Sequence, residues 1–156
     1  MVYRLIIILL GLGACVLACR KQYLVGYYSS KESFLKDCQW KNKEGIRYKP
    51  LSNYVDSLKT LRDTLEVKLF LGTWCSDSKK WVPRFFHLMQ YLPIKSLEII
   101  AVDTSKLDSK KLALVYQVDS VPTFLFFKNQ NLYKRLNVKP HKMRLEKALY
   151  HLLKPS

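Results

Sequence analysis

A cysteine at the junction between a predicted strand and a predicted helix is the feature that most constrains how this chain can fold. The mostly apolar run 67–73 is typical of a buried strand, and apolar residues at helical spacing over 82–92 indicate the helix. The segment Trp74-Cys75-Ser76-Asp77-Ser78 joins the two. The first amides of a helix have no intrahelical acceptor, so they would stabilise a thiolate at Cys75. Ser78 stands three residues later, so a disulfide exchange begun at Cys75 has no local second thiol to complete it.

Apolar periodicity predicts an alternating series of helices and strands along the rest of the chain. A turn at 128–131 would join the last two strands as a hairpin. Helices are expected over 51–61, 82–92, 112–116 and 145–152, and strands over 66–71, 97–102, 123–127 and 132–136. This order predicts an α/β fold with a mixed central sheet and helices on both faces.

Three separated features within residues 66–153 resemble the thioredoxin family. Trp74-Cys75-x-x-Ser78-Lys79, with Pro83 further along, resembles the family's active-site helix. Val121-Pro122-Thr123 resembles its cis-proline loop, and 123–129 resembles its penultimate strand and turn. The resemblance implies a thioredoxin-like fold in which Cys75 is the nucleophile. The loop before Pro122 would then offer backbone groups to an extended substrate peptide.

Two further positions depart from the family's pattern. The resemblance places the family's buried acid at Leu69, six residues before Cys75, and the partner lysine of that acid at about Ile99. In the family the acid is taken to help deprotonate the second cysteine, so its loss together with that cysteine is chemically coherent. The resemblance therefore implies that the two-cysteine reductase cycle is lost as a unit.

The side chains around Cys75 have opposing effects on its thiolate. Ser78 Oγ lies one helical turn along and is expected to donate a hydrogen bond to the sulfur, whereas the negative charge of Asp77 disfavours a second anion nearby. Trp74 would shield one side of the sulfur from solvent. The candidate site comprises Trp74, Cys75, Ser76, Asp77, Ser78 and Lys79, with Val121, Pro122 and Thr123 as the substrate loop.

A single thiol limits the chemistry that this site can perform. It permits mixed-disulfide formation with a client protein or a small thiol, resolved by an external thiol, and it permits isomerisation of wrong disulfides. It does not permit net reduction by an internal two-cysteine cycle, and it requires no cofactor. The alternative is that Cys75 is a relic and that the fold serves as a non-catalytic binding or assembly module.

The first residues are typical of an export signal. Arg4 supplies a charged start, and the apolar run 5–19 covers 15 residues, short of the ~20 that span a bilayer. Val16-Leu17-Ala18-Cys19 resembles the lipobox of bacterial lipoproteins, in which the cysteine is acylated and becomes the mature N-terminus. Cys15 also fits that pattern, but processing there would leave a signal of only 14 residues. The alternative is a plain signal or an uncleaved anchor.

These features divide the chain into a signal peptide over 1–18, a lipid-anchored tether and extension over 19–50, and one domain over 51–156. Within the extension, Ser29 and Glu32 fit the capping box of a short helix. The mature protein is expected in the cell envelope, facing the periplasm or another extracytoplasmic space from a membrane. Its expected partners are exported proteins with cysteines or a small thiol.

The remaining charged and thiol groups are less informative. Cys38 is either a small buried hydrophobe or the partner of Cys75 in the single intrachain bridge that the mature chain could form. The net charge of +15 is spread along the sequence and suits a solvated or membrane-adjacent surface. No motif for nucleic acid accompanies it, so no nucleic-acid partner is expected. No metal is expected either, because ligand-like spacing is absent from His87, His141 and His151.

Overall fold

Five strands form one mixed sheet in the described part of the chain, in the order β1-β3-β2-β4-β5. The computed structural model describes residues 23–38, 40, 45, 47–61, 64–138 and 144–155. β2 and β3 run parallel, and the other neighbouring strands are antiparallel. The strands are β1 Gly26–Tyr28, β2 Leu65–Leu71, β3 Ile94–Ala101, β4 Thr123–Lys128 and β5 Asn131–Asn137. The predicted mixed sheet and the hairpin at 128–131 are therefore confirmed.

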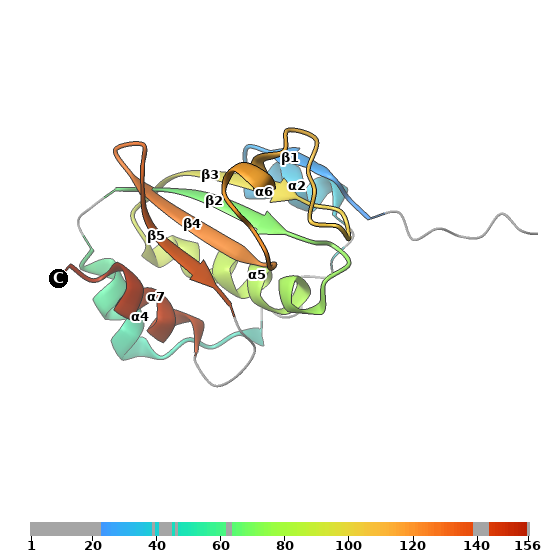
Figure 1. Ribbon diagram of the computed structural model, residues 1–156. Helices are drawn as coiled ribbons and strands as arrows, with labels where there is room; N and C mark the ends of the chain where they lie inside the picture. The colour runs from blue at the N-terminus through green and yellow to red at the C-terminus, as the bar shows by residue number, and fades with distance from the viewer. Residues whose placement is uncertain are drawn as a thin grey trace, which may run out of the picture.

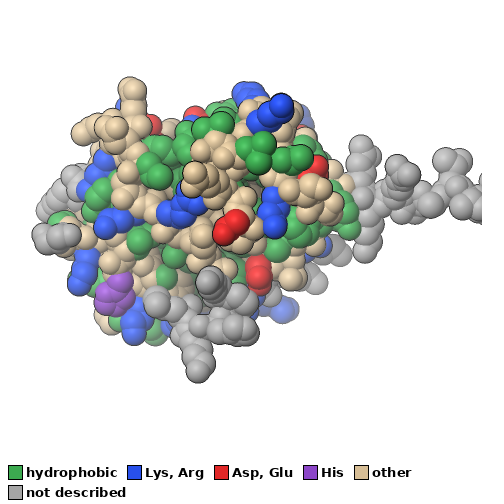
Figure 2. Space-filling view, viewed as in Figure 1, with side chains coloured by type: hydrophobic (Ala, Val, Ile, Leu, Met, Phe, Trp, Pro, Cys, Tyr) green, Lys and Arg blue, Asp and Glu red, His purple; other side chains and the backbone are tan. Residues whose placement is uncertain are grey.

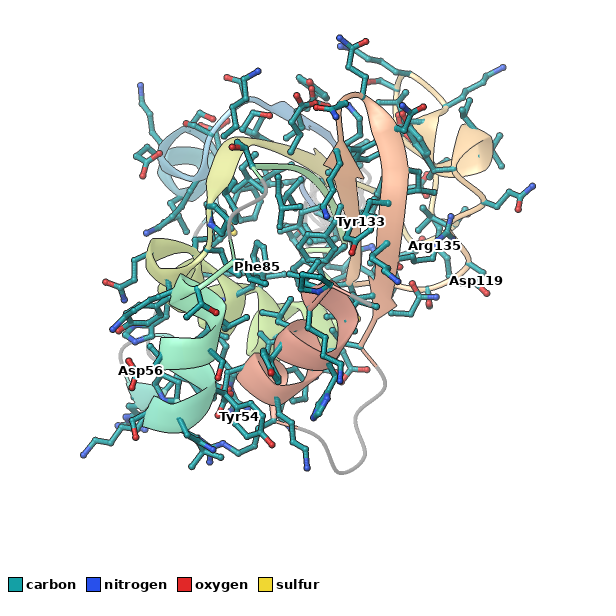
Figure 3. The ribbon with its side chains drawn as sticks, turned by 90° about the vertical axis from the view of Figure 1, so that its left-hand side faces the viewer. Tyr54, Asp56, Phe85, Asp119, Tyr133 and Arg135 are labelled. Carbon is teal, nitrogen blue, oxygen red and sulfur yellow. The ribbon has the colours of Figure 1, made fainter. Side chains whose placement is uncertain are left out.

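Helices cover the two faces of the sheet unequally. In Figure 1, α4, α5 and α7 lie on one side of the sheet and the short α6 lies on the other. Phe85 of α5 packs between its helix and the sheet, with its ring centroid 4.5 Å from that of Phe124 in β4 (Figure 3). The helices are α2 Lys31–Asp37, α4 Ser52–Lys59, α5 Ser76–Leu88, α6 Leu112–Val115 and α7 Leu145–Leu153, and a 3₁₀ turn, η1 Met89–Tyr91, follows α5.

The segment predicted to be a tether contributes to the domain. β1 extends the sheet, with Tyr27 opposite Ile100 of β3, and Phe34 of α2 is fully buried in the core. The sequence prediction that the domain begins at residue 51 was therefore too late. The helix was expected, but its N-cap is Ser30 rather than Ser29, because Ser30 Oγ accepts a hydrogen bond of 3.1 Å from the Ser33 amide.

On the face drawn in Figure 2, the basic side chains are dispersed. Figure 2 shows Lys and Arg side chains scattered among apolar and polar atoms over the visible face. Among the described residues, no helix combines the length and the apolar character that crossing a membrane requires. The predicted signal over 1–18 and the predicted acylation site Cys19 lie outside the described residues.

Candidate active site at the start of α5

Cys75 is the N-cap residue of α5, as the strand-to-helix pattern predicted. Its backbone is extended, with φ −79° and ψ 128°, and its carbonyl accepts the first helical hydrogen bond from the Lys79 amide at 3.1 Å. The Cys75 side chain makes no capping hydrogen bond to the helix and is partly exposed. The sulfur is thus held where the partial positive charge of the helix N-terminus is strongest.

The predicted substrate loop lies directly against this sulfur. Cys75 Sγ donates a hydrogen bond of 3.4 Å to the Val121 carbonyl, although the two residues are 46 positions apart in sequence. The Val121–Pro122 peptide bond is cis, as the resemblance implied. The fold therefore brings together the two parts of the site that the sequence predicted separately.

Hydrogen bonds hold both the substrate loop and the segment that precedes it. Thr123 is fully buried, and its hydroxyl donates to the Ser120 carbonyl at 2.7 Å. Arg135 of β5 donates to the Gln117 carbonyl at 3.0 Å and to the Tyr116 carbonyl at 2.5 Å. In Figure 3 the side chain of Arg135 lies on the side of β5 that faces the segment carrying Asp119. Sequence reasoning missed Arg135, because nothing in its own strand indicates a contact with a distant loop.

Ser78 does not occupy the role that the sequence suggested. Its side chain is fully buried, and its Oγ accepts a hydrogen bond of 3.2 Å from the Gly72 amide. Within the described residues, no hydrogen bond joins Ser78 to Cys75. The expected donation from Ser78 to the sulfur is therefore wrong for this structure. The hydroxyl instead ties the end of β2 to the first turn of α5.

The indole of Trp74 covers Gly72. Its Nε1 donates to the Val102 carbonyl at 3.1 Å, which fixes the indole at the end of β3. A Cβ added at Gly72 would lie 2.6 Å from Trp74 Cε2, closer than real side chains approach. Trp74 and Cys75 pack against the same buried apolar cluster. Shielding of the thiol by the indole stays a prediction.

Substituting Gly72 by alanine is expected to displace the Trp74 indole and to destabilise the domain by about 1–3 kcal/mol, the usual cost of overpacking. Tryptophan fluorescence and denaturant unfolding measure the two effects. Gly26→Ala is the matched control, because a Cβ there would meet its nearest atom at an ordinary 3.6 Å. Equal fluorescence and stability changes in the two variants would contradict the packing described for Trp74.

The rest of the predicted motif surrounds the helix start. Asp77 is half-buried in the first turn of α5, where a negative charge is favourable to the helix. Ser76 and Lys79 are exposed to solvent.

Cys38 belongs to the core and not to the active site. It is 6% exposed, and both it and Cys75 are free thiols. Burial raises the pKa of the Cys38 thiol, and a hydrogen bond with the Trp40 backbone and the charge of Lys79 only partly oppose this. Of the two interpretations left open for Cys38, the structure agrees with the small buried hydrophobe.

The positions of the missing acid and lysine are apolar neighbours. Leu69 of β2 and Ile99 of β3 are directly paired in register, and both are fully buried. Two aliphatic side chains therefore fill the place where the resemblance expects a charged pair.

The N-terminal segment also contacts the active-site loop, a feature that sequence reasoning missed. The Leu24 amide donates a hydrogen bond of 3.0 Å to Thr73 Oγ1, and Thr73 itself is buried. The segment before β1 is thus fastened two residues before Cys75 in the loop that carries the thiol. A lone threonine at the end of a strand carries no signal for such a partner.

Comparison with known sequences settles the family of this chain. Residues 49–151 match the family model described as Thioredoxin. The chain belongs to the thioredoxin family. The matched range begins after β1 and α2, so these two elements precede the part that carries the family's sequence pattern.

The individual relatives of this thioredoxin-family chain are distant. It is 35% identical over 60 residues to the chloroplastic Thioredoxin Y of Oryza sativa subsp. japonica, covering 38% of this chain and 34% of the relative. It is 31% identical over 83 residues to the chloroplastic Thioredoxin Y2 of Arabidopsis thaliana, covering 53% of this chain and 48% of the relative. The chain therefore spans less than half the length of these two curated relatives.

One solved structure shares the fold over most of the chain. A protein of unknown function from Pseudomonas aeruginosa superposes with a TM-score of 0.54 and 15% identity, covering 69% of this chain and 70% of that one. At this identity the likeness concerns the fold alone.

Proposed function

We propose that this thioredoxin-family protein exchanges disulfides with exported client proteins or a small thiol through one nucleophile, Cys75. The observation that carries the proposal is the placement of Cys75, a partly exposed residue, at a helix N-terminus with its sulfur 3.4 Å from the carbonyl oxygen of Val121, which precedes the cis-proline. The position one helical turn along holds a buried serine and no thiol. Mixed-disulfide formation or isomerisation is therefore favoured over dithiol reduction.

The exchange needs no oxidant or reductant beyond the thiols involved. The Cys75 thiolate attacks one sulfur of a client disulfide, the new bond joins Cys75 to that sulfur, and the other client sulfur leaves as a thiolate. An external thiolate then attacks the client sulfur of the mixed disulfide and releases Cys75 as a thiolate. When the second attack comes from another cysteine of the same client, the disulfide is rearranged without net redox change.

Alanine or serine at Cys75 is expected to abolish disulfide-linked adducts with extracytoplasmic proteins. Cys75→Ser removes the nucleophile, whereas Cys38→Ser is a matched control that removes a thiol whose burial and raised pKa keep it unreactive. Trapping with an alkylating agent and non-reducing electrophoresis measure the adducts. In the folded wild-type chain, iodoacetamide should also label Cys75 well before Cys38.

Two outcomes would contradict the exchange function. Adducts that persist in Cys75→Ser would place the chemistry elsewhere. A Cys75 thiol that does not react in the folded protein would favour the non-catalytic binding or assembly module. One observation favours the binding or assembly module. Leu69 and Ile99 are apolar, so their two positions supply no charged pair to assist proton transfer.

The proposed location is the cell envelope, with Cys19 as the acylated first residue of the mature protein. The support is the sequence 16–19 after an apolar segment of signal length. Mass spectrometry of the native protein is expected to show an N-terminal peptide that begins at Cys19 and carries lipid. Cys19→Ala should move the protein from the membrane fraction to the soluble fraction or leave the signal uncleaved. An unlipidated N-terminus at another residue would overturn the anchor.

A further inference from the structure

A cationic pocket lies at the opposite end of α5 from Cys75. Its cavity of about 360 Å³ is lined by Arg47, Tyr48, Lys49, Arg84 and Arg144, so four of its five lining side chains are cationic. Arg84 follows Cys75 by nine residues on the same helix, which places the two about 13 Å apart along its axis.

The carboxylate of Glu146, next to this pocket, is already bound by hydrogen bonds within the protein. Glu146 is fully buried, and its oxygens accept hydrogen bonds from the Tyr48 hydroxyl, from Arg144 Nε at 2.6 Å and from the Leu51 amide at 3.0 Å. Burial opposes ionisation of Glu146, but these hydrogen bonds outweigh it and hold the pKa of its carboxyl below the ordinary value. Glu146 therefore organises the wall of the pocket and offsets only part of its positive charge.

The pocket is also built before any ligand arrives. Arg144 donates to the Lys49 carbonyl as well as to Glu146, so its guanidinium plane is held in one orientation. The Tyr48 ring is close to two cations, with the guanidinium carbons of Arg84 and Arg144 at 5.2 and 5.8 Å from its centroid. Arg47 and Lys49 flank Tyr48 in sequence and are exposed, so their charges can turn toward an incoming group.

We propose that this pocket binds a phosphate group. Guanidinium and ammonium groups are the usual donors to phosphate oxygens, and a dianion is the charge that several convergent cations favour. The phosphate could belong to a free phosphorylated compound or to an anionic lipid headgroup, since both present the same oxygens. This site is independent of the chemistry at Cys75.

Inorganic phosphate is the first probe, with binding to the full chain measured by calorimetry at low ionic strength. Arg47→Gln with Lys49→Gln is expected to weaken phosphate binding about tenfold or more, as the loss of charged hydrogen bonds predicts. Lys36→Gln with Lys95→Gln is the matched control, because it removes the same charge at two exposed positions elsewhere. The control should remain within about twofold of the wild type.

Vesicles distinguish the two sources of phosphate. Phosphatidylcholine vesicles with and without phosphatidic acid are compared by flotation for the wild type and both double variants, so that any apolar anchoring contributes equally. Binding that rises with phosphatidic acid and falls only in the pocket variant supports a lipid headgroup. Phosphate binding without this lipid effect supports a free compound. No measurable phosphate binding, or an equal loss in the control variant, would overturn the site.

Discussion

Replacing Glu146 by alanine is expected to lower the free energy of unfolding by about 3 kcal/mol, because it leaves buried polar partners without an acceptor. The Tyr48 hydroxyl and the Leu51 amide would lose the carboxylate that now receives them. The Arg144 side chain is 45% exposed, so water compensates it and its share of the loss is smaller. Denaturant unfolding at neutral pH measures the change.

The matched control is Asp56→Ala, which removes the carboxylate of an exposed pair. The Asp56 and Lys59 side chains are 69% and 54% exposed, and such pairs contribute at most about 0.5 kcal/mol. A loss at Glu146 no larger than that at Asp56 would show that the buried network does not hold α7 and the segment before α4 together.

The same carboxyl gives the stability of the domain a dependence on acid. The pKa of Glu146 is lower in the folded protein than its ordinary value of 4.5, so the folded state binds fewer protons than the unfolded state below that pH. Its contribution is therefore complete above about pH 4.5 and is lost as pH falls through the lower folded value. Wild-type stability should fall more between about pH 5 and stronger acid than that of Glu146→Ala. Parallel pH profiles would contradict this linkage.

Substituting Ser78 by cysteine is expected to convert a chain with two free described thiols into one with a disulfide between Cys75 and the introduced thiol. Residues three apart on a helix have Cβ atoms about 5–6 Å apart, and modest adjustment brings them within disulfide reach. The new thiol gives up the hydrogen bond to the Gly72 amide, which costs about 1 kcal/mol. Mass spectrometry after mild oxidation and thiol labelling measures the fraction of the protein that contains this disulfide.

Ser76→Cys is the control for this experiment, since it adds a thiol at an exposed position that does not face along the same side of the helix. It should remain reduced under the same oxidant or form bonds between molecules. Absence of an intramolecular disulfide in Ser78→Cys would show that the first turn cannot close around the two sulfurs.

Adding Leu69→Asp to Ser78→Cys should speed turnover, at a cost in stability. The new carboxyl would stand at a fully buried position beside Ile99, without the cation that the family places there. Insulin reduction and denaturant unfolding measure the gain and the loss together.

The sequence predicted most of the local elements, because apolar periodicity and the cis-proline motif depend on neighbouring residues. The strands β2, β4 and β5 and the helices α4, α6 and α7 agree with the predicted ranges to within about two residues at their ends. The helix α5 begins six residues before its predicted apolar stripe, directly after Cys75. The strand β1 was not predicted from the sequence, because its structure depends on a distant partner. β1 is a three-residue strand whose pairing with β3 decides its structure.

Within the site, too, features set by local motifs were predicted, whereas contacts between distant residues were missed. The pairing of Cys75 with the loop of Pro122 followed from two recognisable motifs. Three contacts join residues between six and 98 positions apart: Ser78 with Gly72, Arg135 with Gln117, and Tyr48 with Glu146. No single segment indicates such partners, because the polar groups are satisfied only after the chain has folded.

The contact between the Leu24 amide and Thr73 has a consequence for where substrates can come from. Five residue steps separate Cys19 from Leu24, a contour of at most about 18 Å. With lipid on Cys19, as we propose, the cysteine loop would stay within about that distance of the headgroup layer whatever the domain's orientation. Proteins newly emerging from the bilayer, or bound along its surface, would meet Cys75 at high local concentration. Freely diffusing ones would first have to approach the membrane, so proximity to the bilayer would favour the first group as clients.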